Sequence, residues 1–246
     1  MVPTMINCGT YVVSREHDEI HRLLYEMIPK DDIYMHYRLG GTLLDVCTDV
    51  YFLAHENGEG LSRVWMCWGK HAGAVSNWGA VFTKEAHRGR GLCRIVLDHC
   101  FAELDRMQAP PPALFCTAGP IAKFYAEYGF VPAIAGRTEG PLYCPRNGSP
   151  ASFRDFCEAY YTAADTLRAI PADFGRRNEI DCLLRFALVD RGIPFGIGEE
   201  RDLYPILMKS PERAKVLLTP NGKTVGWMLD GKAQVHPTYE KAEILL

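Results

Sequence analysis

Apolar positions in the first part of the chain follow two different spacings. Between residues 20 and 27 they recur every three or four residues, which predicts an amphipathic helix. Ser14 is the expected N-cap of this helix, and Pro29 is expected to end it. Asn57-Gly58 predicts a hairpin turn, and the stretch 31–49 is ambiguous. Runs of aromatic and β-branched residues predict strands at 11–13, 51–55, 62–68 and 75–83.

From residue 92 onward, predicted helices and strands alternate. The apolar stripe of residues 92–107 predicts a long helix that ends before a run of prolines. A strand at 113–116, a helix at 120–128 and a strand at 130–134 follow, with Gly129 ending the second helix. This alternation is typical of an α+β or α/β layer in which some neighbouring strands are parallel.

A segment rich in Pro, Asn, Gly and Ser at 144–150 separates two regions of the chain. We therefore predict one domain over residues 1–144 and a C-terminal extension over 149–246. The extension is expected to be ordered, because its apolar residues follow regular spacings and include many aromatics. Its predicted elements are helices at 153–167 and 176–190 and a β-hairpin at 216–229 whose turn is Pro220-Asn221-Gly222.

Composition changes this picture little. The 246 residues are 48% hydrophobic and 23% charged, and the net charge of -3 excludes a global attraction to nucleic acid or anionic membranes. No apolar run reaches the roughly 18 residues of a membrane helix, and residues 1–7 lack the pattern of a targeting signal, so we expect a cytoplasmic protein. The nine cysteines form no CxxC pair and share no ligand spacing with histidines, so we expect no metal.

The stretch 81–94 carries the candidate chemistry. A predicted strand leads into a loop that contains Arg88, Gly89, Arg90 and Gly91, and the loop leads into the long helix. Unpaired backbone N–H groups and the positive end of the helix dipole converge there, and both favour a phosphate. The glycines permit positive φ and close approach, and the arginines can add charge-assisted hydrogen bonds. The loop is therefore a candidate diphosphate site.

The spacing within this loop disfavours two common nucleotide sites. The loop lacks the Gly-Lys-Ser/Thr ending of a triphosphate-binding P-loop, and it lacks the GxGxxG spacing of a dinucleotide site. A kinase or a dehydrogenase is therefore disfavoured. For the short motif taken alone, a surface turn with solvated arginines is the competing interpretation.

The sequence RGRGLC at 88–93 resembles the acetyl-CoA pyrophosphate loop of the GNAT superfamily of N-acetyltransferases, which reads Arg/Gln-x-x-Gly-x-Gly/Ala. Val81 and Thr83 match the end of the strand that precedes this loop in the family. Cys93 stands where the family prefers Gly or Ala, and its small side chain is compatible with close approach of the cofactor.

A second motif, AKFYAEYGF at 122–130, resembles the family's helix that flanks the pantetheine arm and carries a tyrosine near the thioester. Tyr125 stands at the position of that tyrosine. Gly119 stands where the family usually has Asn. The two motifs occur in the family's order, separated by one helix and one strand, and together they are far more specific than either alone.

The resemblance implies an α+β fold for residues 1–144. In the GNAT fold a central mixed, mostly antiparallel sheet has helices on both faces. Its strands ending here at Thr83 and Cys116 would splay apart, and the pantetheine would enter the gap. The helical and hairpin extension would follow as an addition to this fold.

The resemblance also implies acetyl-CoA (coenzyme A) as the cofactor and a set of contacts to it. A main-chain N–H near Phe82 would polarise the thioester carbonyl, a primary amine of a small molecule or peptide would attack directly, and Tyr125 would protonate the departing thiolate. A buried aromatic without a catalytic role is the competing interpretation of Tyr125. The implied cofactor-binding residues are Val81, Phe82, Thr83, Arg88, Gly89, Arg90, Gly91, Leu92, Cys93, Arg94 and Ala122.

A general base for the amine is not identified by the sequence. Between Gly73 and Thr83 the polar residues are Ser76 and Asn77, and a chain of water molecules to a distant carboxylate could serve. Further candidates lie in predicted turns, where a solvated side chain is the competing interpretation; these are Glu56, His71, Glu85 and His87.

Two alternative functions compete with the N-acyltransferase. One is a GNAT-like domain that binds acyl-CoA as a sensor or scaffold without turnover, which Cys93 and Gly119 favour. The other is a nucleic-acid module, which the absence of a basic stripe with interleaved aromatics disfavours. For the extension, we expect a part in the acceptor site, a homodimer contact or added stability.

Overall fold

The computed structural model describes residues 6–246, so residues 1–5, most of the stretch inspected for a targeting signal, lie outside the described residues. The chain forms two compact units. The first contains Met1–Trp68 and Trp78–Pro110, and the second contains Gly69–Asn77 and Pro111–Leu246. The expected end of the family domain near residue 144 lies inside the second unit and stays a prediction.

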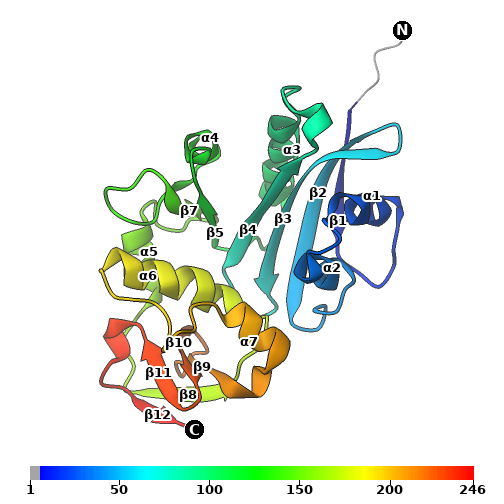
Figure 1. Cartoon of the computed structure of the whole chain (residues 1–246). Helices are drawn as coiled ribbons and strands as arrows, with labels where there is room; N and C mark the ends of the chain where they lie inside the picture. The colour runs from blue at the N-terminus through cyan, green and yellow to red at the C-terminus, as the bar shows by residue number, and fades with distance from the viewer. Residues whose placement is uncertain (1–5) are drawn as a thin grey trace. The chain divides into compact units, whose positions relative to one another are not determined.

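The first unit combines strands with helices (Figure 1). The last residue of β3 and the first two residues of β4 belong to the second unit. The elements are β1 (Asn7–Val12), α1 (Glu19–Met27), α2 (Ile33–Leu39), β2 (Cys47–Glu56), β3 (Glu59–Gly69), β4 (Ser76–Thr83), the 3-10 turn η1 (Glu85–His87) and α3 (Leu92–Arg106).

The strands of this unit are hydrogen-bonded in the order β1-β2-β3-β4. β1 runs antiparallel to β2, with Tyr11 opposite Tyr51. The predicted hairpin turn between β2 and β3 is confirmed, and Asn57 and Gly58 have φ of 51° and 75°. Two consecutive positive φ values are the signature of the tight turn whose twist matches that of the strands it joins.

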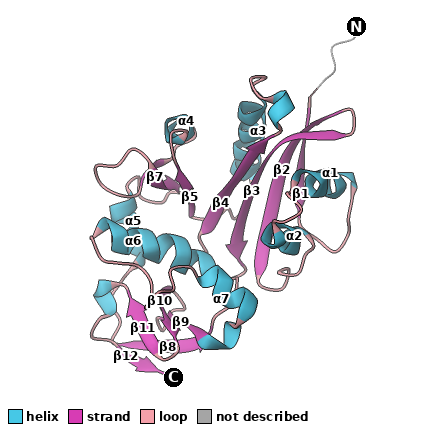
Figure 2. Ribbon diagram, viewed as in Figure 1, coloured by secondary structure: helices cyan, strands magenta, loops and turns pink. Residues whose placement is uncertain are grey.

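Both faces of β2 are covered by helices. Tyr51 and Leu53 belong to one core cluster with Leu23 of α1, whereas the ring of Phe52 lies 6.0 Å from that of His99 in α3. Because successive side chains of a strand point to opposite faces, a strand covered on both sides needs apolar residues at nearly every position. Figure 2 shows α1 and α2 on one side of these strands and α3 on the other.

The N-cap of the first helix differs from the prediction, and the second helix lies in a stretch for which no element was predicted. The N-cap of α1 is Asp18 rather than Ser14, because the Asp18 carboxylate accepts a first-turn backbone N–H at 2.8 Å, while Ser14 forms a local turn with the backbone of Glu16. The ambiguous stretch 31–49 contains α2, which Asp32 caps in the same way.

A buried ion pair joins α2 to β2. Arg38, 1% exposed, donates from Nε and Nη2 to the carboxylate of Asp49 at 2.6 and 3.1 Å. Trp65 of β3 donates its indole N–H to the same carboxylate at 2.8 Å. The guanidinium also lies 5.0 Å from the centre of the Trp65 ring. Because every partner is withdrawn from water, each charge depends on the other being present.

The second unit contains the remaining strands and most of the short helices. Its elements are β5 (Ala113–Ala118), α4 (Ala122–Ala126), β6 (Val131–Pro132), β7 (Gly140–Pro145), α5 (Phe153–Tyr160), β8 (Thr166–Pro171), the π-helical segment η2 (Glu179–Leu184), α6 (Arg185–Asp190), α7 (Leu203–Lys209), the 3-10 turn η3 (Pro211–Arg213), β9 (Ala214–Leu218), β10 (Thr224–Leu229), β11 (Lys232–Val235), the 3-10 turn η4 (Pro237–Tyr239) and β12 (Glu243–Leu245).

β5 is the parallel neighbour that the strand and helix alternation predicted. Ser76 and Asn77 of β4 pair in parallel with Leu114 and Phe115 of β5. On its other side β5 pairs antiparallel with β7 over its whole length, and β7 in turn pairs with the short β6. β7 was not predicted from the sequence, because its segment GPLYCP has a proline near each end and no period-two alternation.

The C-terminal extension contains more sheet than predicted. The expected hairpin is present as β9 and β10, but it belongs to a five-stranded sheet of order β11-β10-β9-β8-β12. The predicted helix over 153–167 is wrong in its second half, since α5 ends at Tyr160 and Leu167 lies in β8 opposite Ile244. Alanines that follow at helical spacing made the end of the helix impossible to locate from the sequence. In the structure, Lys223 donates to the Tyr160 carbonyl at the end of α5, at 2.9 Å.

The predicted helix over 176–190 begins as a π-helical segment. All six residues of η2 are buried, including Glu179 and Asp181. Asp181 accepts hydrogen bonds from Arg177 Nε at 2.6 Å and from the Leu203 backbone N–H at 3.0 Å. π-helical turns are rare and are often found at functional sites, so the two buried carboxylates of this segment need an explanation beyond packing.

Within residues 6–246, none of the helices combines the length and the apolar character that crossing a membrane requires. The same residues contain no group of three or more His, Cys, Asp or Glu side chains placed to hold a metal ion. All nine cysteines are free thiols.

Removing the carboxylate of the buried ion pair should destabilise the first unit strongly. Asp49→Ala leaves the Arg38 guanidinium charged and buried, so the free energy of unfolding in urea should fall by about 3–5 kcal/mol. Glu26→Ala is the matched control, since it removes the exposed partner of Arg22 and should cost under about 0.5 kcal/mol. A similar small loss for both variants would contradict the role assigned to Asp49.

The His236 ring should make the stability of the second unit depend on pH. This ring is 1% exposed and stacks on Tyr161 at 3.8 Å, and burial lowers its pKa from 6.5 to about 4. Between these two values the unfolded chain binds a proton that the folded chain excludes, so stability falls as the pH is lowered. The loss should approach about 3 kcal/mol at 1.36 kcal/mol per pKa unit.

The test compares wild-type unfolding free energies at pH 6.5 and pH 4 with those of His236→Asn. The unfolding free energy of the variant should fall less steeply with decreasing pH, because its unfolding takes up close to one proton fewer over this range. Equal slopes for wild type and His236→Asn would rule out His236 as the titrating group.

Candidate functional site

The end of β4 has an unusual backbone at Ala80. Its φ of 47° lies in the left-handed region, which costs a residue other than glycine about 1–3 kcal/mol. Arg63, which is buried, donates from Nη1 to the Ala80 carbonyl at 2.8 Å, and its guanidinium lies 5.5 Å from the centre of the Phe82 ring. Such strain, held in place by a buried cation, is typical of functional sites. Nothing in the sequence around Ala80 predicted this conformation.

The three residues that follow Ala80 are half-buried. The Ser62 hydroxyl donates to the Phe82 carbonyl at 3.1 Å and lies 2.9 Å from the Thr83 hydroxyl oxygen. This end of β4 is therefore tied to β3 through a side chain. Whether Val81, Phe82 and Thr83 contact a cofactor stays a prediction.

Two glycines shape the loop between η1 and α3. Gly89 and Gly91 have φ of 79° and 75°, and Gly91 is the N-cap residue of α3. A Cβ placed on either glycine would meet nothing within 4 Å. The glycines are therefore required by the backbone conformation and leave open space above the loop, as the sequence predicted.

Several backbone N–H groups of this loop have no acceptor among the described residues. Within residues 6–246, no acceptor is found for the N–H groups of Gly89, Arg90, Gly91, Leu92 and Cys93, and no side chain caps α3. Further along the helix, the Ile95 N–H donates to the Gly91 carbonyl at 3.1 Å. α3 has 15 residues, so the positive end of its dipole adds to these donors. An anion with several oxygens suits this arrangement.

The arginines of the loop are exposed but partly engaged. Arg88 donates from Nε to the Thr83 carbonyl at 3.4 Å. Arg90 donates from Nη2 to Glu56 at 3.2 Å, and its Nη1 lies 3.0 Å from His87 Nδ1. The side chain of Arg90 is thus held against the β2 end, and the anion-binding capacity of the loop rests on its backbone donors. Arg94 is exposed on the first turn of α3.

α4 carries the second motif. Its predicted span of 120–128 shortens to Ala122–Ala126, because Gly129, with φ of 87°, ends the turn that follows. Tyr125 is 6% exposed, with the Phe130 ring 5.9 Å away, and Ala122 is buried beside it. The burial of Tyr125 agrees with both interpretations of this residue, so its acid role stays a prediction.

Two of the candidate bases are not solvated side chains. His71, 17% exposed, places Nε2 3.1 Å from the fully buried carboxylate of Glu179, and Glu56, 14% exposed, pairs with Arg90. The interpretation of these two as solvated turn residues is wrong, because each has an ionic partner distant in sequence. His87 lies 3.4 Å from Glu59, while Glu85 is exposed.

Comparison of the sequence with protein-family models and with curated proteins gives no match. Solved structures do match. An acyl-CoA N-acyltransferase from Pseudomonas aeruginosa is 17% identical, with a TM-score of 0.42 over 58% of this chain and 100% of that one. Escherichia coli ElaA is 17% identical, with a TM-score of 0.45 over 57% and 99%. The GNAT-family N-acetyltransferase YhbS of Escherichia coli, in complex with CoA, is 15% identical, with a TM-score of 0.41 over 57% and 82%.

The topology of residues 7–145 agrees with the mixed, mostly antiparallel sheet that the two motifs implied. The β4–β5 pair is parallel, whereas β1–β2, β5–β7 and β6–β7 are antiparallel. The strand order and strand directions are therefore those that the resemblance to the GNAT superfamily implied. In this fold the motif at 88–93 lies between β4 and α3, and the motif with Tyr125 lies on α4. The predicted separation of the strand ends at Thr83 and Cys116 stays a prediction.

Proposed function

We propose that this protein is an N-acyltransferase that moves an acetyl or other short acyl group from coenzyme A to a primary amine of a small molecule or peptide. The observation that carries the proposal is the loop at 88–93. Its two left-handed glycines hold five backbone N–H groups that have no acceptor among the described residues, at the start of a 15-residue helix. The donor set fits the paired phosphates of a coenzyme.

The residues that would hold coenzyme A follow from the resemblance and from the local geometry. The amides of Gly89, Arg90, Gly91, Leu92 and Cys93 would bind the pyrophosphate, and Arg88 and Arg94, both exposed, would add charge. Val81, Phe82, Thr83 and Ala122 would contact the pantetheine arm. When bound, the coenzyme supplies an activated acyl group as a thioester.

The transfer reaction also requires several proton transfers. The substrate ammonium must first lose a proton to water. Its nitrogen then forms a bond to the acyl carbon as the carbon–sulfur bond breaks, and the nitrogen releases a second proton to water to become the amide. A main-chain N–H near Phe82 would stabilise the charge that develops on the carbonyl oxygen. Tyr125 would donate a proton to the leaving sulfur and recover it from solvent.

Binding without turnover is the second candidate function. The side chain of Arg90 is held by Glu56, and Gly119 provides no side chain at the position where the family has Asn. Both features leave fewer polar contacts for a cofactor than the motif implies. A sensor or scaffold that binds acyl-CoA needs only the loop, so turnover is the measurement that separates the two functions.

Coenzyme A should bind through the loop and stabilise the fold. Gly91→Ala strains a φ of 75° and brings a methyl group to the donors, so it should weaken coenzyme A at least tenfold in calorimetry. Gly58→Ala is a matched control, because Gly58 has the same φ and its added Cβ would also meet nothing within 4 Å.

Both glycine variants should lose a similar stability, of about 1 kcal/mol, while Gly58→Ala keeps wild-type affinity for the coenzyme. Acetyl-CoA and desulfo-CoA should each raise the melting temperature of the wild type. Absence of any shift with either compound, or equal affinities of the two variants, would contradict the proposal.

Loss of the Tyr125 hydroxyl should slow acyl transfer without weakening coenzyme A. The acceptor is first found by mass spectrometry of a panel of primary amines incubated with acetyl-CoA and the protein. With that acceptor, Tyr125→Phe should lower kcat by about 100-fold or more. Tyr128→Phe, on the same segment but less buried, is the control and should leave kcat unchanged. An unchanged kcat for Tyr125→Phe across pH would remove Tyr125 as the acid.

A further inference from the structure

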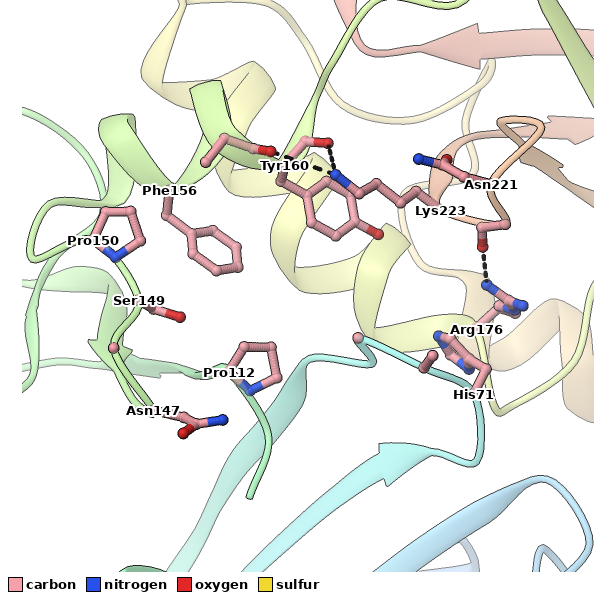
Figure 3. A pocket seen from close by; sticks show the side chains of 15 residues that line it. His71, Pro112, Asn147, Ser149, Pro150, Phe156, Tyr160, Arg176, Asn221 and Lys223 are labelled. Carbon is pink, nitrogen blue, oxygen red and sulfur yellow. Dashed lines mark hydrogen bonds between the residues drawn. The ribbon is translucent and has the colours of Figure 1, made fainter. Parts of the chain in front are cut away.

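A cavity of about 530 Å³ lies within the second unit, and no motif of the sequence accounts for it. Six separate parts of the chain line it, and Figure 3 shows their side chains around a common space. The lining residues that matter below are His71, Phe156, Tyr160, Arg176 and Lys223. The volume is in the range that small-molecule sites occupy.

The lining of this cavity is cationic. Arg176 and Lys223 contribute positive charge, and none of the lining residues is Asp or Glu. The other polar groups come from residues that can donate hydrogen bonds without carrying negative charge, such as Asn147 and Ser149. A ligand with a negative charge would therefore meet attraction and no repelling side chain from the wall.

Arg176 is held in place before any ligand arrives. Its Nη1 donates to the Gly222 carbonyl at 2.8 Å and lies 3.2 Å from the Thr224 hydroxyl oxygen, and its backbone N–H donates to Asp173. Within the part of the chain that the structure describes, Nε and Nη2 of Arg176 have no hydrogen-bond partner. One edge of a fixed guanidinium thus remains available for two parallel hydrogen bonds to a carboxylate.

Lys223 offsets the partial negative charge of a helix C-terminus in the same wall. The last carbonyls of α5 come from Ala159 and Tyr160, which line the cavity, and Lys223 Nζ donates to them at 3.4 and 2.9 Å. A helix C-terminus carries partial negative charge, so this lysine compensates it. The ammonium also lies 5.2 Å from the centre of the Tyr160 ring.

The ring of His71 is positioned by Glu179 and by the absence of a side chain at Gly69. Its Nε2 lies 3.1 Å from Glu179 Oε1, which also accepts the Val75 backbone N–H at 3.1 Å. Gly69 permits this ring position, because a Cβ there would lie 1.9 Å from the Gly175 carbonyl oxygen and 2.5 Å from the His71 ring. The Glu179 side chain is fully buried, and its Oε1 contact orients the imidazole of His71 at the cavity wall.

The opposite part of the wall is apolar. Pro112, Pro150 and Phe156 line it together with the face of Tyr160. In Figure 3 the side chains of Arg176 and His71 lie on one side of the space and those of Asn147 and Pro150 on the other, with the two aromatic rings along the edge between them. The cavity is thus charged at one end, while its other end combines apolar side chains with the uncharged polar side chains of Asn147 and Ser149.

We propose that this cavity binds a small organic carboxylate whose body is apolar or aromatic. The carboxylate is recognised by the free edge of Arg176, next to the His71 ring that Glu179 orients. The body of the ligand packs on Phe156, Pro150 and Tyr160. This site is separate from the coenzyme loop in its residues and goes beyond the proposed acyl transfer.

The available donors favour a carboxylate over the two other simple ligand classes. A free phosphate needs more donors than one guanidinium edge provides, since Nη1 of Arg176 and two N–H groups of Lys223 already have acceptors. An organic ammonium would meet two cations and no acid in the wall. A carboxylate needs two parallel donors, which is what Arg176 has left.

The test uses the full chain without coenzyme and a matched set of probes. Binding of 3-phenylpropanoate, 3-phenylpropan-1-ol and 3-phenylpropylamine is measured by calorimetry and by ligand-observed NMR, with inorganic phosphate as a competitor. The carboxylate should bind at least tenfold more tightly than the alcohol or the amine. Phosphate should displace it only weakly.

Variants locate the binding. Arg176→Gln should weaken the carboxylate at least tenfold and remove its advantage over the alcohol, and Arg176→Lys, which keeps the charge, should recover part of it. Ala159→Phe should block all three probes by filling the space. Arg213→Gln is the control, since Arg213 also donates to a neighbouring group, Asp230, but does not line the cavity.

Equal affinities for acid and alcohol, absence of binding by any probe, or an Arg213→Gln effect as large as that of Arg176→Gln would overturn the proposal. So would stronger binding of phosphate than of the carboxylate. A variant that loses its cooperative thermal transition is replaced in the comparison by Ala159→Phe. None of these outcomes bears on the coenzyme loop, which is tested separately by the Gly91 and Gly58 variants.

Discussion

The direction of a few backbone N–H groups at the start of α3 is the constraint on which the functional assignment depends. Gly89 and Gly91 adopt left-handed conformations that other residues reach only with strain. With those conformations, five donors of the loop are left without acceptors among residues 6–246. A helix end normally recruits a side-chain cap, and α3 has none. The N–H groups of the loop are therefore available to a bound ligand.

Local chemistry explains why this part of the molecule could be predicted. Glycines at 89 and 91, a strand before them and an apolar stripe after them are all visible within 25 or so residues of sequence. The Asn57-Gly58 turn is equally local, since both residues accept positive φ. Helix ends were less certain: Ser14 and Asp18 are both good caps, and the choice between them depends on where the chain leaves β1.

Interactions between distant residues explain what could not be predicted. His71 and Glu179 are 108 positions apart, so nothing local in the sequence joins them, and His71 on its own looks like a turn residue. The strands β7, β8 and β12 are short and contain proline or polar residues, and they are strands because of the neighbours that pair with them. Ala80 has an unremarkable sequence context, and its conformation is held by Arg63 from another strand.

The aromatic cluster around Phe115 gives the predicted boundary near residue 144 a different meaning. Phe115 of β5 is fully buried, and the rings of Phe153, Phe156 and Phe186 all lie within 6.2 Å of it. A fragment cut at the boundary would keep Phe115 and lose those three rings, which would leave part of a buried core as exposed apolar surface. Substitutions in the two stretches are therefore expected to be energetically coupled, because a larger side chain on one needs a smaller one on the other to keep the packing.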